Sequence, residues 1–194
     1  EIIVVDTGSI DETPQIAASL GARVYHFPWC DSFSAARNES LKYATGDRIL
    51  WIDTDDTIDD DNARKIRELP LDELDPSVFG LVVQVHCPGT DDDDDLDVTV
   101  VDHVKLFRNL PHLRFEHRIH EQILPAISRA GGRVEWSDLF VVHSGYDNSP
   151  EGQKKKLERD LRILHLELSE QPNHPFTLFN LGMTYADIRA FDEA

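Results

Sequence analysis

The first 53 residues alternate between short apolar runs and stretches with helical spacing. Apolar runs are typical of buried strands, whereas apolar residues three or four positions apart form one face of a helix. A glycine, which commonly ends a helix, closes the first helical stretch and lies near the end of the second. The pattern predicts strands at 1–6, 22–27 and 48–53 and helices at 11–21 and 31–47. Strands and helices that alternate with short links predict an α/β fold with a mostly parallel sheet.

Polar residues follow the first and the third of these strands. Residues 6–9 read Asp-Thr-Gly-Ser, and residues 53–56 read Asp-Thr-Asp-Asp. In open parallel sheets, ligands bind beyond the carboxyl ends of the strands. Both turns are therefore candidates for ligand binding, and a solvated acidic loop is the alternative for the second turn.

The pattern changes to one rich in strands after a helix expected at 59–70. We predict strands at 77–87, 96–109 and 133–146. Residues 88–97 contain a run of five aspartates. We interpret this run as a hairpin tip or disordered loop, because it lacks the Gly and Glu spacing of an EF-hand calcium site.

The last part of the sequence is helical. Residues 150–172 place leucines on one stripe of an amphipathic helix, and Pro172 closes it. Residues 175–194 have the spacing of a tetratricopeptide repeat that stops within its second helix. We expect an α/β domain at 1–148, a linking helix at 149–172 and a partial repeat at 173–194.

Composition narrows the class of protein. A formal charge of −18 argues against nucleic acid or an anionic membrane as the main partner, since both attract basic patches. The two cysteines, Cys30 and Cys87, are too few for a disulfide framework or a cysteine zinc site, which favours a cytoplasmic location. No run has the length of a membrane span, and no signal peptide opens the sequence. We expect a fragment, because residue 1 already lies in a strand pattern.

The acidic turn after the third strand has the chemistry of a metal site. Mg²⁺ and Mn²⁺ prefer carboxylate oxygens, which Asp53, Asp55 and Asp56 supply. Side chains alternate along a strand, so Asp53 and Asp55 could share a side. Asp59, Asp60 and Asp61 instead fit the first turn of the following helix, where the helix dipole favours negative charge.

Several stretches resemble a known family. EIIVVDTGSIDET, FPWCDSFSAARNESLKYATGD and ILWIDTDD are similar to the nucleotide-binding half of family 2 glycosyltransferases with the GT-A fold. HVKLFRNLPHLRFEHRIHEQI and VVHSGY resemble the bacterial branch in which tetratricopeptide repeats follow the catalytic domain. The resemblance spans nearly the whole chain and implies a Rossmann-like sheet with flanking helices. It also implies one further strand before residue 1.

The resemblance implies an inverting, metal-dependent transfer of a sugar from a nucleotide-diphosphate sugar to an acceptor hydroxyl. Mn²⁺ or Mg²⁺ would neutralise the charge that builds on the leaving diphosphate. The family pattern makes Asp55 or Asp56 the direct ligand in some members, and His143 resembles a late histidine that completes the metal shell. A core histidine is the alternative for His143.

The same resemblance implies a donor-nucleotide site. Its residues are Asp6, Thr7, Gly8, Ser9, Arg37, Asp53 and Thr54. Thr7 stands where many members have a second carboxylate that reads the base, so a preference for uridine does not carry over. For Arg37, positive charge near the diphosphate and a structural salt bridge are both open.

An acidic residue should accept the proton of the acceptor hydroxyl. Glu121, in RIHEQI, resembles the family's position for this base, and direct displacement needs one such group. Glu116 and His120 are close enough in sequence to compete for the role.

The expected partners are a nucleotide-sugar donor and an acceptor that is a glycan, a lipid or a protein. The repeat segment could also bind a partner protein. Two rival functions stay open: a sugar nucleotidyltransferase, and a non-catalytic tetratricopeptide scaffold with a degenerate transferase-like domain. The nucleotidyltransferase would need a Gly-rich, basic signature at the first turn, and TGSIDET has none.

Overall fold

A computed structural model describes residues 1–88, 98–145 and 149–190. The chain divides into two compact units. The first unit draws its described residues from 1–43, 115–122 and 147–194, and the second unit from 44–114 and 123–146. The aspartate run at 91–95 and the last four positions of the expected repeat lie outside the described residues.

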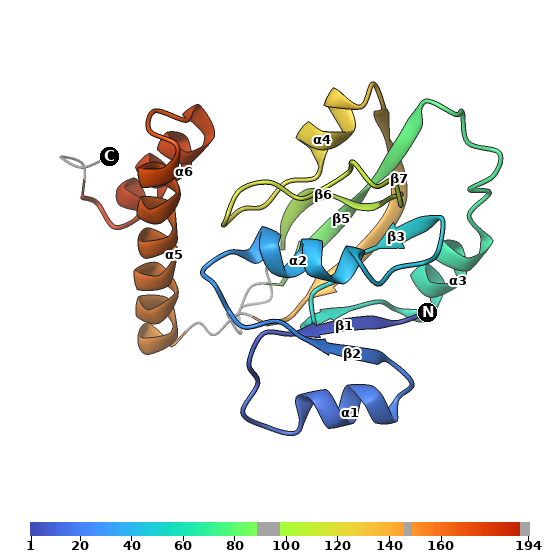
Figure 1. The fold of residues 1–194 in the computed structure, drawn as a ribbon, viewed down its shortest axis with the longest axis horizontal. Helices are drawn as coiled ribbons and strands as arrows, with labels where there is room; N and C mark the ends of the chain where they lie inside the picture. The colour runs from blue at the N-terminus through green and yellow to red at the C-terminus, as the bar shows by residue number, and fades with distance from the viewer. Residues whose placement is uncertain (89–97, 146–148, 191–194) are drawn as a thin grey trace. The chain divides into compact units, whose positions relative to one another are not determined.

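The first unit begins with a strand, helix, strand, helix order (Figure 1). β1 (Ile3–Asp6) pairs in parallel with β2 (Arg23–His26), and α1 (Thr13–Ser19) connects them. Ser32 caps the next helix, α2 (Phe33–Leu41), because its side chain accepts a hydrogen bond from the Ala35 backbone N–H at 3.1 Å. These elements confirm the first four predictions, with shorter bounds.

Two further helices complete the first unit. α5 (Pro150–Glu170) begins at a Ser149 cap, and α6 (Pro175–Asp187) packs against it. Ile163 and Leu164 of α5 and Leu181 of α6 are buried in one apolar cluster, which removes their side chains from water. Within the described part of the chain, no helix combines the length and the apolar composition that a membrane span requires.

The second unit is built on a five-stranded sheet of order β3-β6-β5-β7-β4. Its strands are β3 (Arg48–Leu50), β4 (Asp56–Thr57), β5 (Val78–Cys87), β6 (Thr99–Arg108) and β7 (Arg133–His143). β5 lies between β6, with which it is antiparallel, and β7, with which it is parallel. The long strands confirm the β-rich prediction for this part of the chain, and the whole is a mixed α/β fold.

One strand pairing differs from the expectation. The strand predicted at 48–53 does not extend the β1–β2 sheet; β3 pairs antiparallel with β6, with Ile49 opposite Phe107. The larger sheet is therefore mixed rather than mostly parallel. An apolar run predicts burial but not a partner, and β6 offers buried Leu106 and Phe107 beside β3. The short elements β4 and α4 (Leu124–Arg129) were not predicted, because neither has a run long enough to show periodicity.

Asn62 ties helix α3 (Asp60–Glu68) to the sheet of the second unit. Asp59 caps α3 by accepting from the Asn62 backbone N–H at 2.7 Å, as expected for the first turn. The Asn62 side chain is fully buried, and its Oδ1 accepts from the Phe140 backbone N–H of β7 at 3.0 Å. The Asn62 side-chain amide thus supplies the hydrogen-bond acceptor for this strand N–H.

Replacing this amide should destabilise the protein. Asn62→Ala leaves the Phe140 N–H without its acceptor in a buried position, which costs about 1–3 kcal/mol. We expect a lower thermal midpoint in calorimetry, with Arg67→Ala, at an exposed position of the same helix, as the matched control. Equal midpoints for the two variants would contradict this role of Asn62.

Candidate functional site

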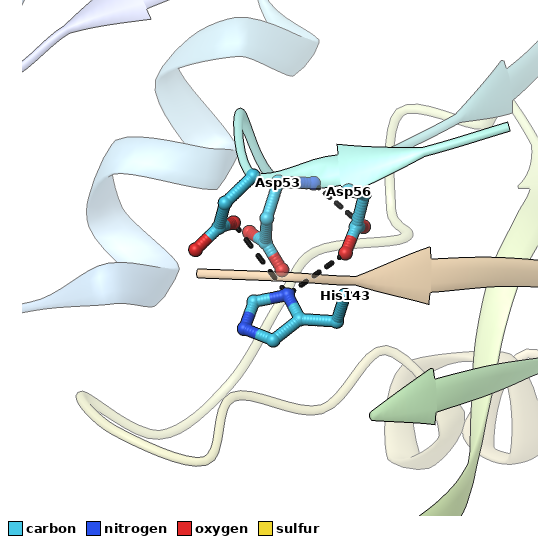
Figure 2. Close-up of side chains that lie close together, drawn as sticks. Asp53, Asp56 and His143 are labelled. Carbon is cyan, nitrogen blue, oxygen red and sulfur yellow. Dashed lines mark hydrogen bonds and ion pairs between the residues drawn. The ribbon is translucent and has the colours of Figure 1, made fainter. Parts of the chain in front are cut away.

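Strand register brings an acidic turn and a histidine together in the second unit. The turn after β3 carries Asp53 and Asp55, and Asp56 opens β4. In the β4–β7 ladder, Asp56 lies opposite His143. Figure 2 shows Asp53, Asp56 and His143 converging there. The acidic turn and the histidine meet because β4 pairs antiparallel with β7, over only two residue pairs.

Asp56 is the buried centre of this cluster. Its side chain is 0% exposed, and it accepts hydrogen bonds from Lys105 Nζ at 2.6 Å and from the Asp53 backbone N–H at 2.9 Å, both through Oδ2. Its Oδ1 lies 2.9 Å from His143 Nδ1 (Figure 2). Burial acts to raise the pKa of Asp56, but the hydrogen bonds from Lys105, Asp53 and His143 outweigh it and hold the pKa below its ordinary value. Asp56 is thus an ionised acceptor, to which His143 Nδ1 donates.

Lys105 supplies the positive charge beneath the acidic turn. Its side chain is 2% exposed, and its Nζ lies 4.0 Å from Asp53 Oδ2 and 3.9 Å from the ring centroid of Trp51. The three aspartates carry three negative charges and Lys105 carries one positive charge, so two negative charges remain when His143 is neutral. The sequence prediction missed Lys105. A lysine between the apolar residues Val104 and Leu106 of a strand was the available signal.

Gly145 fits against Asp55 and was also missed. A Cβ atom at position 145 would lie 1.7 Å from Asp55 Oδ2, so only glycine leaves room for this carboxylate. The Ser144 backbone N–H donates to the Asp55 carbonyl at 3.1 Å and holds the two loops together. Ser144 and Gly145, which follow His143, therefore shape the acidic cluster through their backbone, in addition to the His143 imidazole.

The cluster fits a divalent cation. Ligand atoms of Asp53, Asp55, Asp56 and His143 all lie within 4.8 Å of one another. Carboxylate oxygens with one imidazole nitrogen form a donor set suited to Mn²⁺ or Mg²⁺. The Asp53 and Asp55 side chains are 37% and 41% exposed, so ions can reach them from solvent, unlike Asp56.

The predicted donor turn forms a separate feature in the first unit. Asp6 is buried at the end of β1, and its Oδ1 accepts from the Ser9 backbone N–H at 3.1 Å. Hydrogen bonds from the Ser9 side chain and backbone, and from His26, hold the pKa of Asp6 below its ordinary value. Gly8 has a φ of 121°, a conformation that favours glycine. Thr7 is partly exposed and Ser9 is exposed on this turn, and Thr54 is exposed in the second unit.

Arg37 and Glu121 form an ion pair within the first unit. Arg37 Nε donates to Glu121 Oε1, and the two side chains are 19% and 11% exposed. The salt bridge that the sequence left open for Arg37 is therefore formed, and its partner is the predicted base. His120, the competing base, is an exposed residue with a φ of 54°. Partial desolvation lowers the pKa of His120, which favours the neutral imidazole. Glu116 pairs through its backbone with Gln122.

Comparison with known proteins identifies the family. The model for "Glycosyl transferase family 2" matches residues 1–123. The chain belongs to glycosyltransferase family 2, which confirms the resemblance seen in the sequence.

Curated relatives extend the match to the helical end. A TPR repeat-containing protein from Synechococcus elongatus is 31% identical over 188 residues, covering 94% of this chain and 45% of the relative. The SPbeta prophage-derived glycosyltransferase SunS of Bacillus subtilis is 26% identical over 191 residues, covering 94% of this chain and 42% of the relative. The chain thus spans somewhat less than half of each of these relatives. A repeat-containing relative agrees with the tetratricopeptide spacing expected after residue 172.

Two solved structures have a similar fold, and one of them is described as a mannosyltransferase. S. aureus TarS has a TM-score of 0.55 at 18% identity, covering 98% of this chain and 37% of that chain. Mannosyltransferase PcManGT from Pyrobaculum calidifontis, solved with GDP-Man and Mn²⁺, has a TM-score of 0.52 at 16% identity. The match covers 96% of this chain and 59% of that chain. These likenesses support the GT-A fold.

Removing the buried lysine should destabilise the second unit. Lys105→Met keeps the length of the side chain but leaves Asp56 buried without a counter-charge, which costs about 3–5 kcal/mol in unfolding free energy. Urea denaturation measures the loss. Lys65→Met, which breaks the exposed Lys65–Asp138 pair, is the control and should lose much less. Adding Asp56→Asn to Lys105→Met should recover part of the loss, and a double variant less stable than Lys105→Met alone would contradict the pairing.

Proposed function

We propose that the protein is an inverting, metal-dependent glycosyltransferase that moves a sugar from a nucleotide-diphosphate sugar to an acceptor hydroxyl. The observation that carries the proposal is the cluster of Asp53, Asp55, Asp56 and His143, which retains two negative charges above Lys105. Family membership supplies the reaction class, and the cluster supplies a place for the cation that a leaving diphosphate requires.

Within this proposal, Asp55 and His143 bind the cation and Asp56 orients His143. His143 donates from Nδ1 to Asp56, so in the neutral ring Nε2 carries the lone pair available to a metal. Asp55 lies beside the same imidazole, with its Oδ1 3.5 Å from Nδ1. Asp56 is also predicted as a ligand, and its Oδ1, which contacts only His143 among the hydrogen bonds described for Asp56, is the oxygen that would take this role. A bound Mn²⁺ or Mg²⁺ supplies charge neutralisation at the diphosphate.

The donor nucleotide is assigned to two groups of residues. We assign the base and ribose to the turn Asp6–Thr7–Gly8–Ser9, whose Gly8 conformation leaves open space where a Cβ would lie. Asp53 and Thr54 are assigned to the nucleotide on the second unit. The GDP-Man and Mn²⁺ bound to PcManGT support a nucleotide sugar and Mn²⁺ as the first ligands to test.

Glu121 is proposed as the base. In direct displacement, the acceptor oxygen forms a bond to the anomeric carbon while the bond to the diphosphate breaks, and the diphosphate leaves with the electron pair. Glu121 takes the hydroxyl proton. Arg37, its partner, orients the carboxylate. The repeat segment is proposed to bind the acceptor or a partner protein.

Metal-dependent nucleotide binding is the first test. Titration calorimetry with UDP and GDP should show binding of at least one nucleotide that is at least about tenfold tighter with Mn²⁺ than without it. Asp55→Asn should abolish this gain, whereas Asp60→Asn, an exposed carboxylate at the start of α3, should keep it. A folded protein that binds neither nucleotide would favour the non-catalytic scaffold.

Loss of the base should separate binding from transfer. Glu121→Gln keeps a hydrogen-bonding group beside Arg37 but cannot accept the proton, so turnover should fall by about 10²-fold or more. Nucleotide affinity, measured by the same titration, should stay within about twofold. Glu116→Gln and His120→Asn are the controls, and either of them losing turnover while Glu121→Gln stays active would move the base to that residue.

A further inference from the structure

We propose that Glu167, on helix α5, is a positioning residue that fixes the loop carrying Glu121. The inference rests on the proposed role of Glu121 as the base. It gives α5, which the sequence marks as a linking helix, a part in the transfer reaction. All residues concerned belong to the first unit.

Residues 116–122 form a closed loop. The backbones of Glu116 and Gln122 exchange two hydrogen bonds of 2.9 and 3.0 Å, so the five residues between them bulge from a narrow neck. Asn38 of α2 holds the neck by exchanging two 2.8 Å hydrogen bonds with the Phe115 backbone. Glu121 is the last residue before the neck closes, so its position depends on the path of this loop.

The backbone of the loop is strained at two positions. His117 has a φ of 69° and His120 has a φ of 54°, in the left-handed region that non-glycine residues seldom adopt. Such conformations persist only where surrounding contacts hold them. An apolar contact comes from Ile119, which is buried with Ile163 and Leu164 of α5.

Glu167 provides a polar contact from α5, in addition to the hydrogen bond that the Phe33 backbone N–H donates to the Arg118 carbonyl at 2.7 Å. Its side chain is 3% exposed, and its two oxygens accept from two successive loop residues: His117 Nδ1 at 2.6 Å and the Arg118 backbone N–H at 2.9 Å. Phe176 stacks on the His117 ring with a centroid separation of 4.1 Å. One carboxylate thus fixes the side chain of a strained residue and the peptide that follows it.

No other described contact of α5 with the loop can substitute for these two bonds. Glu170 pairs with the Arg118 guanidinium, whose side chain is 24% exposed, and leaves the loop backbone untouched. A glutamine at 167 has one amide oxygen for two partners, so it keeps the bond to His117 only if the imidazole changes tautomer. Both bonds also become weaker, because a neutral amide replaces the carboxylate. With these contacts weakened, the loop would hold Glu121 less firmly. A misplacement of about 1 Å at a reacting group can cost as much as 10²-fold in rate, so turnover should fall.

The test compares Glu167→Gln with Glu158→Gln, an exposed carboxylate on the same helix. Hydrogen exchange of residues 117–121 should be faster in Glu167→Gln than in the control.

Release of nucleoside diphosphate from UDP-glucose, UDP-N-acetylglucosamine and GDP-mannose with Mn²⁺ should show kcat lowered at least about tenfold, with KM within about twofold. If Glu167→Gln does not fold, Glu167→Asp, which keeps the charge but shortens its reach, replaces it and should show both changes.

A double variant shows whether Glu167 acts through Glu121. Residues that act as one unit are not additive, so Glu121→Gln with Glu167→Gln should be no slower than Glu121→Gln alone. A further drop in the double variant, or loop exchange equal to the control, would overturn the positioning role. Wild-type turnover in Glu121→Gln, or no release of nucleoside diphosphate by the unchanged protein, would instead count against the proposed function. In that case, the hydrogen exchange of residues 117–121 would still show whether Glu167 holds the loop.

Discussion

The ion pair between Asp56 and Lys105 is the constraint on which the acidic cluster depends. A carboxylate without solvent contact is stable only with a counter-charge and hydrogen bonds, and β6 supplies Lys105 for this purpose. Because Asp56 also contacts the Asp53 backbone and His143, the pair fixes the turn, β4 and the end of β7 together. The turn therefore holds Asp53 and Asp55 in position although their side chains are partly exposed.

Much of this arrangement could be predicted from the sequence. Apolar runs located the long strands, and glycine, proline and capping residues located most helix ends. The grouping of Asp53, Asp55 and Asp56 was expected from their position after a strand, and the approach of His143 from the family resemblance. These features are local, or follow a motif whose spacing is fixed.

Features that depend on partners were not predictable in the same way. The pairing of β3 with β6 depends on which distant strand offers the better buried neighbours, which a local pattern does not encode. Lys105 looks like a surface lysine until β6 is known to face Asp56, and Gly145 looks like an ordinary turn residue until Asp55 lies against it. Glu167 likewise sits among the charged residues of an amphipathic helix, and only the path of residues 116–122 shows that it is buried.

The apolar cluster around Ile119 has a consequence for how such proteins can be recombined. Ile119 belongs to the stretch that matches the transferase family, whereas Ile163, Leu164 and Leu181 come from the helices that follow it. The two parts share a core, so they are not interchangeable modules. Joining the preceding residues to foreign helices at residue 149 would expose Ile119 to water and remove the Glu167 carboxylate that contacts the loop. Substitutions at Ile119 and in these two helices are therefore expected to depend on one another.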